Sequence, residues 1–199
     1  MFRCWASVIL ALIVTATYVT SLPGSYAIQR RASKCNGYQD LCNRKYSNVT
    51  HIGAHDSFAV GKLGSLGSNQ EANVTVQLED GIRLLQIQTH ASSGHQDSNP
   101  SGLSLCHTSC ALKNGGTLES YLRQVKQFLD QNKNEIVTLV ITNPDNKPVS
   151  NFAKAFENTG LNSMAYRANS NSISKNDWPT LQEPVSYTHL RAHETSLHL

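Results

Sequence analysis

Apolar and polar positions along the chain follow two different periods, which predict strands and helices in turn. Residues 82–90 alternate with a period of two, the period of a strand whose two faces differ. One face carries Leu84, Gln86, Gln88 and His90. The other face carries Arg83, Leu85 and Ile87. Because polar side chains repeat on the first face, this strand is expected to line a cavity.

The same patterns predict the other elements of the fold. Further strands are expected at 49–55, 103–107 and 136–142, and the last is a continuous apolar run typical of a strand buried on both faces. Helices are expected at 74–79, from the Thr117 N-cap to 132, and at 149–158. The glycine-rich residues 61–70 are expected to form a mobile loop.

The order of these elements predicts the fold class. Strands that alternate with helices are typical of α/β proteins with a parallel sheet, and an incomplete TIM-type (β/α) barrel is the leading form. A complete barrel has eight strands, whereas four strand candidates precede the end of the regular pattern near Trp178. About half of such a barrel is therefore expected, over residues 48–183.

The amino-terminal residues predict export. Arg3 precedes an apolar run at 8–14, which is shorter than the roughly 20 residues that a membrane-spanning helix needs. Residues 1–27 are interpreted as a signal peptide that ends in small residues, with a signal anchor as the alternative. The dibasic pair Arg30-Arg31 offers a further processing site, which would place the mature start at Ala32.

The cysteines that remain after the leader are even in number: Cys35, Cys42, Cys106 and Cys110. In an exported chain such a set favours disulfides, of which three pairings are formally open. The short separations favour Cys35 with Cys42 and Cys106 with Cys110, and the first pair would staple residues 28–47 into an N-terminal cap. A zinc site is the alternative.

Charge and glycosylation signals describe the expected surface. The net charge is +3 over 199 residues, and no run of five or six like charges occurs. A nucleic-acid partner is therefore excluded. Two sequons predict N-glycosylation at Asn48 and Asn73, in agreement with export.

Four short motifs between Cys35 and Gln182 occur in one order: Gly53-Ala54-His55-Asp56-Ser57, Asp80-Gly81-Ile82-Arg83, Leu105-Cys106-His107-Thr108-Ser109-Cys110 and Asp177-Trp178-Pro179-Thr180-Leu181. Together they resemble the fungal branch of the phospholipase C-like phosphodiesterases. The resemblance implies a distorted barrel with its catalytic site at the carboxyl ends of the strands.

The resemblance also implies roles for individual residues. His55 would remove a proton from an inositol hydroxyl beside the phosphodiester, and that oxygen would attack phosphorus to form a cyclic phosphate. His107 would protonate the departing alkoxide, and Asp56 would orient or charge an imidazole. Gln86, Gln88 and His90 are the candidate substrate-binding residues.

The chain departs from the bacterial members of that family on the polar strand. Those members have an Asp and an Arg where this chain has Gln86 and Gln88, and the Arg or a calcium ion stabilises the charge on the phosphate. A glutamine supplies no net charge, and Arg83 has the wrong parity to replace it. The fungal branch shares the glutamines, which leaves the inositol lipid and the calcium ion open.

The leading hypothesis is a secreted phosphoric diester hydrolase or lyase that acts on inositol-type or other polyol phosphodiesters. Its partner would be a small phosphodiester or a phospholipid headgroup, with contact to a membrane surface and no cofactor. A catalytically impaired module that binds a polyol or lipid headgroup is the alternative. A metal-dependent hydrolase built from His55, His90, His107 and Asp56 is a third hypothesis.

Residues 184–199 break the family pattern and resemble a peptide translated from sequencing-adapter DNA. This tail is interpreted as non-native, so His189, His193 and Glu194 are not assigned to a metal. The strands that close the barrel would then be missing. We expect the truncated chain to be inactive and poorly soluble, with strand 136–142 uncovered.

Overall fold

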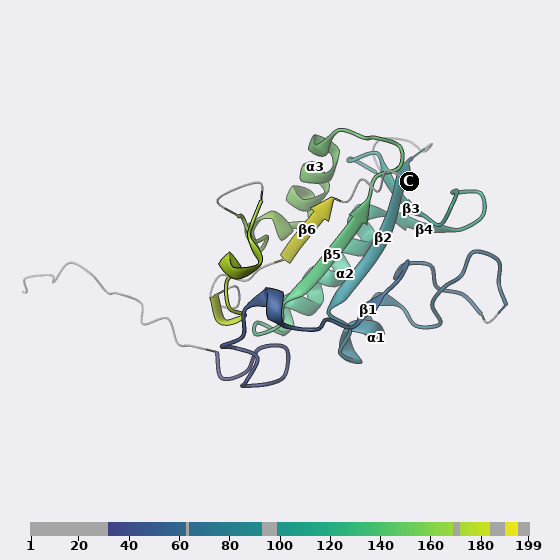
Figure 1. The fold of residues 1–199 in the computed structure, drawn as a ribbon. Helices are drawn as coiled ribbons and strands as arrows, with labels where there is room; N and C mark the ends of the chain where they lie inside the picture. The colour runs from purple at the N-terminus through teal and green to yellow at the C-terminus, as the bar shows by residue number, and fades with distance from the viewer. Residues whose placement is uncertain (1–31, 63, 93–98, 169–171, 184–189, 195–199) are drawn as a thin grey trace, which may run out of the picture.

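The computed structural model describes residues 32–62, 64–92, 99–168, 172–183 and 190–194 (Figure 1). The predicted signal peptide, 1–27, lies outside the described residues. Of the predicted tail, 184–189 and 195–199 lie outside them as well, whereas 190–194 form a strand. The foreign origin of the tail remains a prediction.

The described residues form a six-stranded curved sheet in the order β4-β3-β2-β5-β6, with β1 also paired to β2. The strands are β1 (Gly53–Ala54), β2 (Leu84–Ala91), β3 (Leu103–Cys106), β4 (Asn114–Thr117), β5 (Val137–Thr142) and β6 (Leu190–Glu194). β2 pairs in parallel with β1 and with β5, and β5 pairs in parallel with β6. β3 pairs antiparallel with β2, and β4 pairs antiparallel with β3.

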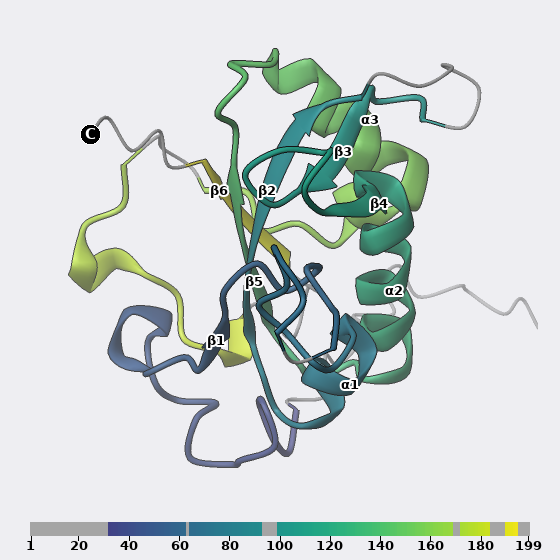
Figure 2. The ribbon, with the colours of Figure 1, turned by 90° about the vertical axis from the view of Figure 1, so that its right-hand side faces the viewer.

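Three α-helices cover one side of the sheet (Figure 2). They are α1 (Val74–Glu79), α2 (Leu118–Gln131) and α3 (Val149–Thr159), and short 3-10 helices occur at Tyr46–Asn48, Leu161–Ser163 and Lys175–Asp177. This arrangement confirms the α/β class and the incomplete (β/α) barrel. None of the helices in the described ranges combines the length and the apolarity that crossing a bilayer requires.

Local signals in the sequence explain where the helices begin and end. The Thr117 hydroxyl accepts the N–H of Ser120 at 3.1 Å and so caps α2. The buried apolar residues of α2 are Leu118, Tyr121, Leu122, Val125, Phe128 and Leu129. α3 ends at Gly160, whose φ of 74° is the left-handed conformation common after a helix.

The predicted two faces of β2 are confirmed. Leu85 and Ile87 are fully buried in the core under the helices, whereas Gln86 and Gln88 are half-buried on the opposite, concave face. Arg83 lies on the helix side, where its Nε donates to Glu135 at 2.8 Å and its guanidinium stacks over Phe128. The chain therefore keeps this cation away from the polar face, as its parity predicted.

Three predictions about strands are wrong. β3 runs antiparallel to β2, not parallel to it. β4 pairs with β3 and was not predicted, because its sequence, Asn-Gly-Gly-Thr, has no apolar alternation that would indicate a strand. The strand expected at 49–55 is reduced to Gly53–Ala54, since His51 stacks on Tyr46 instead of pairing. β5 is not uncovered, because β2 and β6 flank it.

The N-terminal cap is stapled as predicted. Cys35 and Cys42 form a disulfide, and so do Cys106 and Cys110, which contradicts the zinc alternative for these sulfurs. Residues 175–182 fold back onto the cap, where Tyr46 is stacked between His51 and Trp178. Asn48 and Asn73 are both exposed, and their glycosylation remains a prediction.

Candidate active site

Two short strands reach the same edge of β2 from opposite ends. The parallel strand β1 stops where Ala54 pairs with Leu85, and the antiparallel strand β3 pairs Leu105 with Thr89 as it runs the other way. His55 follows the first strand and His107 follows the second. The two imidazoles therefore meet beside the middle of β2, although their strands point in opposite directions.

The two glutamines of β2 hold the chain just beyond each histidine. Gln86 Oε1 accepts the backbone N–H of Asp56 at 2.7 Å, and Gln88 Oε1 accepts that of Thr108 at 2.8 Å. Asp56 and Thr108 have φ values of 42° and 64°, in the left-handed region that non-glycine residues rarely adopt. Each glutamine thus fixes an unfavourable corner next to a histidine.

One carboxylate oxygen joins the two histidines. Asp56 Oδ2 lies 3.1 Å from His55 Nε2 and 3.4 Å from His107 Nε2, and it accepts the Nδ2–H of Asn69 at 2.9 Å. The Asp56 side chain is only 3% exposed, whereas those of His55 and His107 are 72% and 25% exposed. The buried carboxylate therefore lies between two more accessible imidazoles.

A buried hydrogen-bond network holds the chain that follows His55. The Tyr121 hydroxyl donates to Ser57 Oγ at 2.8 Å, and Ser57 Oγ donates to Gln77 Oε1 at 2.5 Å. Burial raises the pKa of Tyr121, so that its hydroxyl keeps the proton it donates. This network fixes the backbone next to Asp56 without any charged group.

The second histidine lies in a loop that is closed at both ends. The Cys106–Cys110 disulfide ties the loop to β3, and the backbone N–H of His107 donates to the Lys113 carbonyl at 3.1 Å. His107 Nδ1 lies 3.0 Å from the carbonyl oxygen of Gly67, in the glycine-rich loop. Sequence reasoning missed Gly67, because a backbone carbonyl leaves no signature in residue types.

His90, the third predicted substrate-binding residue, has a different partner. Its Nδ1 lies 3.0 Å from Asp145 Oδ1, and Asp145 Oδ2 accepts the N–H of Ala91 at 2.7 Å. That N–H, followed by the neighbouring His90, holds the pKa of Asp145 below its ordinary value. Asp145 was missed, and its only sequence signal is its place just after the end of β5.

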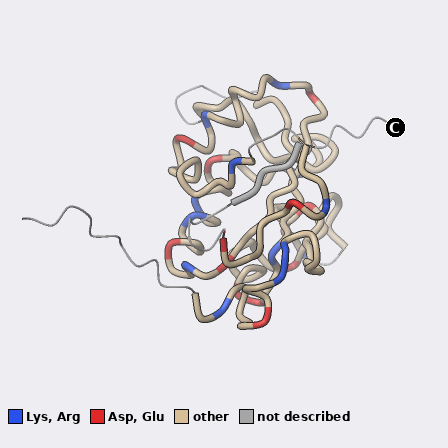
Figure 3. Tube along the Cα trace, turned by 60° about the vertical axis from the view of Figure 1, so that its left-hand side comes forward, with Lys and Arg blue, Asp and Glu red and all other residues tan. Residues whose placement is uncertain are grey.

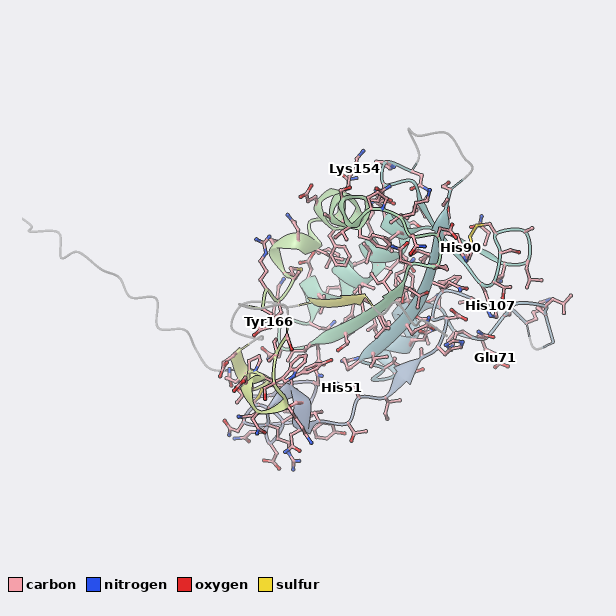
Figure 4. The ribbon with its side chains drawn as sticks, turned by 45° about the horizontal axis from the view of Figure 1, so that its top comes forward. His51, Glu71, His90, His107, Lys154 and Tyr166 are labelled. Atoms are coloured by element: carbon pink, nitrogen blue, oxygen red, sulfur yellow. A yellow bond between two sulfur atoms is a disulfide. The ribbon has the colours of Figure 1, made fainter. Side chains whose placement is uncertain are left out.

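The positions of the histidines separate the predicted residues into groups (Figure 4). His90 and His107 lie towards the carboxyl end of β2, whereas His51 lies near its amino end. His90 pairs with Asp145 and not with the His55–Asp56–His107 group. Within the described ranges, no group of three His, Cys, Asp or Glu side chains is arranged to hold a metal ion. The metal-dependent hydrolase therefore has no geometric support there.

Side chains of like charge do not cluster on one part of the fold. Along the described trace, Lys and Arg are interspersed with Asp and Glu (Figure 3). Gln86 and Gln88 bring no charge to the concave face, and Arg83 is engaged on the other side of β2.

The histidine-bearing half barrel has counterparts among known proteins. The family model PI-PLC X 1 matches residues 41–190. The chain belongs to the PI-PLC X family. Its match with the model includes both histidines, the two glutamines and the whole described sheet up to the first residue of β6.

Curated relatives of this PI-PLC X chain come from fungi and plants. An uncharacterized secreted protein of Arthroderma benhamiae is 44% identical over 151 residues, which are 76% of this chain and 32% of that protein. PI-PLC X domain-containing protein 1 of the same fungus is 40% identical over 178 residues, 88% of this chain and 53% of that protein. The chain thus spans about half, or less, of the relatives it matches.

Solved structures support the same fold. Phosphatidylinositol-specific phospholipase C from Listeria monocytogenes superposes with a TM-score of 0.55 at 18% identity, over 77% of this chain and 53% of that one. The enzyme from Staphylococcus aureus, as an F249X mutant, gives a TM-score of 0.57 at 16% identity, over 77% of this chain and 50% of that one. The described strands therefore correspond to about half of a phospholipase C barrel.

Proposed function

We propose that this PI-PLC X chain is the amino-terminal part of a secreted phosphodiesterase, called the parent protein below. In it, His55 acts as general base and His107 as general acid. The proposal rests on one observation: both Nε2 atoms lie within 3.4 Å of the same Asp56 oxygen. The two disulfides and a relative named as a secreted protein support the extracellular location.

The proposed reaction begins at a hydroxyl next to the phosphodiester. His55, the more exposed imidazole, accepts the hydroxyl proton while the oxygen forms a bond to phosphorus. The bond from phosphorus to the leaving oxygen then breaks, and His107 gives that oxygen a proton. The products are a cyclic phosphate and an alcohol. Water can open the cyclic phosphate by the reverse proton transfers, which accounts for both lyase and hydrolase outcomes.

Asp56 has a specific task in this scheme. Its buried carboxylate stabilises positive charge on whichever imidazole has just gained a proton. Because the same oxygen faces both rings, the carboxylate serves His107 before the transfer and His55 after it. Asn69 donates to that oxygen and so holds it between the rings.

The substrate is proposed to be a phosphodiester of inositol or another polyol. The side-chain oxygens of Gln86 and Gln88 are occupied by backbone N–H groups, and no described residue accepts from their amide nitrogens. These N–H groups can therefore donate to phosphate or hydroxyl oxygens on the concave face. His90, held by Asp145, is the third proposed contact.

Contact with a lipid surface is part of the proposal. Leu66 and Leu112 are 83% and 45% exposed, on the two loops that adjoin His107. The two loops are close together at Gly67, where an added Cβ atom would lie only 3.2 Å from Leu112 Cγ. Two leucines at one rim of the site suit a phospholipid headgroup presented at a membrane.

The test uses the parent protein with an alkyl phosphodiester of myo-inositol and with phosphatidylinositol vesicles, each with and without EDTA. His55→Ala and His107→Ala should each lower kcat/KM by roughly 10²-fold or more, the range expected for general acid–base groups. Gln127→Ala, on the exposed face of α2, is the folded control. Wild-type rates in both histidine variants would refute the proposal. An inactive wild-type protein that binds the vesicles would support binding without cleavage instead.

A further inference from the structure

We infer that residues 67–70, at the end of the glycine-rich loop, are part of the catalytic apparatus, and that the Gly67 carbonyl is the positioning group that selects the working nitrogen of His107. This inference rests on the proposed function, since it assigns a role within that reaction. Three residues of this segment contact the histidines or their shared carboxylate. The predicted mobility of the loop remains a prediction.

The hydrogen-bond chemistry of His107 leads to this assignment. A backbone carbonyl oxygen can only accept, so the 3.0 Å contact with Gly67 requires a proton on Nδ1. In the neutral ring Nε2 then has no proton, and it becomes the atom that gains and loses one. Nε2 is also the atom that lies 3.4 Å from Asp56 Oδ2. The carbonyl therefore directs proton exchange to the nitrogen that faces the shared carboxylate.

The position of the Gly67 carbonyl depends on the absence of a side chain. Gly67 has a φ of +72°, and an added Cβ would lie 3.0 Å from Lys113 Cβ and 3.2 Å from Leu112 Cγ. Both neighbours belong to the loop that follows His107, and Lys113 accepts the His107 backbone N–H. Any side chain at Gly67 would thus push the two loops apart and draw the carbonyl away from the ring.

Two more residues tie the same loop to the other half of the site. The Asn69 side chain donates to Asp56 Oδ2 at 2.9 Å, and the Gln70 side chain donates to the His55 carbonyl at 2.6 Å. The end of the loop is fixed by a bridge between Val60 and Gln70. One short segment therefore sets the positions of the proposed acid, the base and the carboxylate between them.

The first measurement needs no turnover. Nitrogen-15 NMR of histidine-labelled parent protein at a pH where His107 is neutral, assigned with His107→Ala, should show its proton on Nδ1. Gly67→Ala should shift this population towards Nε2–H, the form that free imidazoles favour in water. A wild-type His107 that is neutral with its proton on Nε2 would overturn the inference, whether or not the protein is active.

The second measurement is kinetic, with Gly64→Ala as the matched control. Gly64 has a φ of +82°, so alanine meets a similar backbone strain there, but no atom lies within 4 Å of its Cβ. With the alkyl phosphodiester, whose alkoxide leaving group needs the proton from His107, Gly67→Ala should lower kcat at least tenfold with KM nearly unchanged, and Gly64→Ala should stay within about twofold of wild type. Equal kcat values for the two variants would contradict the role of Gly67. Loss of activity on His107→Ala with no difference between the glycine variants would leave the proposed function standing and remove the inference alone.

Discussion

Gln88 accepts, through its side-chain oxygen, a 2.8 Å hydrogen bond from the backbone N–H of Thr108, the residue directly after His107. Gln86 makes the equivalent 2.7 Å bond to Asp56, directly after His55. The two glutamines are two residues apart on one strand, so they stand side by side on the concave face. A single strand thus sets the spacing of both histidine corners.

The first prediction concerns these glutamine oxygens. Gln88→Met keeps the length of the side chain but removes the acceptor, so that the left-handed corner at Thr108 loses its support. We expect kcat to fall about tenfold, equivalent to about 1.4 kcal/mol of transition-state stabilisation, because His107 is less well placed. Steady-state kinetics of the parent protein on the alkyl phosphodiester measure the change.

Gln88→Glu separates the two roles that the side chain can have. The glutamate retains an acceptor for the Thr108 N–H but loses the amide donors proposed to bind substrate. If positioning dominates, Gln88→Glu keeps kcat and raises KM, whereas Gln88→Met loses kcat. Loss of kcat to the same extent in both variants would show that the corner at Thr108 does not depend on the acceptor.

The second prediction concerns the charge of Asp56. Asp56→Asn keeps the shape of the side chain but removes the anion that faces both imidazoles. We expect kcat to fall by roughly 10²-fold, because the imidazolium that forms during each proton transfer loses its partner. Unfolding in urea should show that the variant remains folded. A kcat equal to that of the wild type would rule out a role for the carboxylate in proton transfer.

The sequence predicted the two faces of β2 and the buried character of β5 because burial on a sheet follows local alternation. The same alternation separated Arg83 from Gln88 and placed the polar residues on one face. It could not reveal the direction of β3, since a strand of four residues has the same pattern in either direction. Direction is set by the connection and by pairing partners far along the chain.

The candidate site was predicted only in part, for a related reason. The motifs and the family resemblance singled out His55, His107 and Asp56, and the structure brings these three side chains together, while their catalytic roles remain a proposal. Gly67 contributes only a backbone carbonyl, and Asp145 is one carboxylate in a loop, so neither position has a distinctive signal. Their contacts depend on how loops pack, which local periodicity does not encode.

The third prediction links acid sensitivity to His51, which stacks on Tyr46 in the N-terminal cap. Burial lowers the pKa of His51, partly opposed by a hydrogen bond to the Tyr46 backbone. The folded protein therefore binds a proton at His51 less readily than the unfolded chain does, so that stability falls as pH drops below the ordinary value of 6.5 towards the lowered one. Tm measured from pH 7.5 to pH 5 should decline more steeply in the wild type than in His51→Asn.

The asparagine in that comparison is the control for packing, since it is uncharged throughout and can still bond to the Tyr46 backbone. A constant offset in Tm between the two proteins would mean that His51 contributes packing but no proton linkage. The Tyr46–Trp178 stack is present in both proteins and should contribute equally at every pH.

The fourth prediction concerns Asp145, which ties the loop after β5 to the end of β2. The Ala91 N–H, and then His90, hold the pKa of Asp145 below its ordinary 3.8. A carboxyl with a lowered pKa adds stability above its unfolded value and loses that contribution as pH falls through the folded value. Asp145→Asn should therefore lower Tm at pH 6, and the difference from wild type should shrink below pH 4. The pKa of Asp130 is lowered first by Lys126 on α2 and also by Lys133 just after that helix. Asp130→Asn is therefore a control, whose effect on Tm 0.5 M salt should largely remove. A gap between Asp145→Asn and wild type that stays constant down to pH 3 would show that the Ala91 and His90 contacts do not depend on the charge.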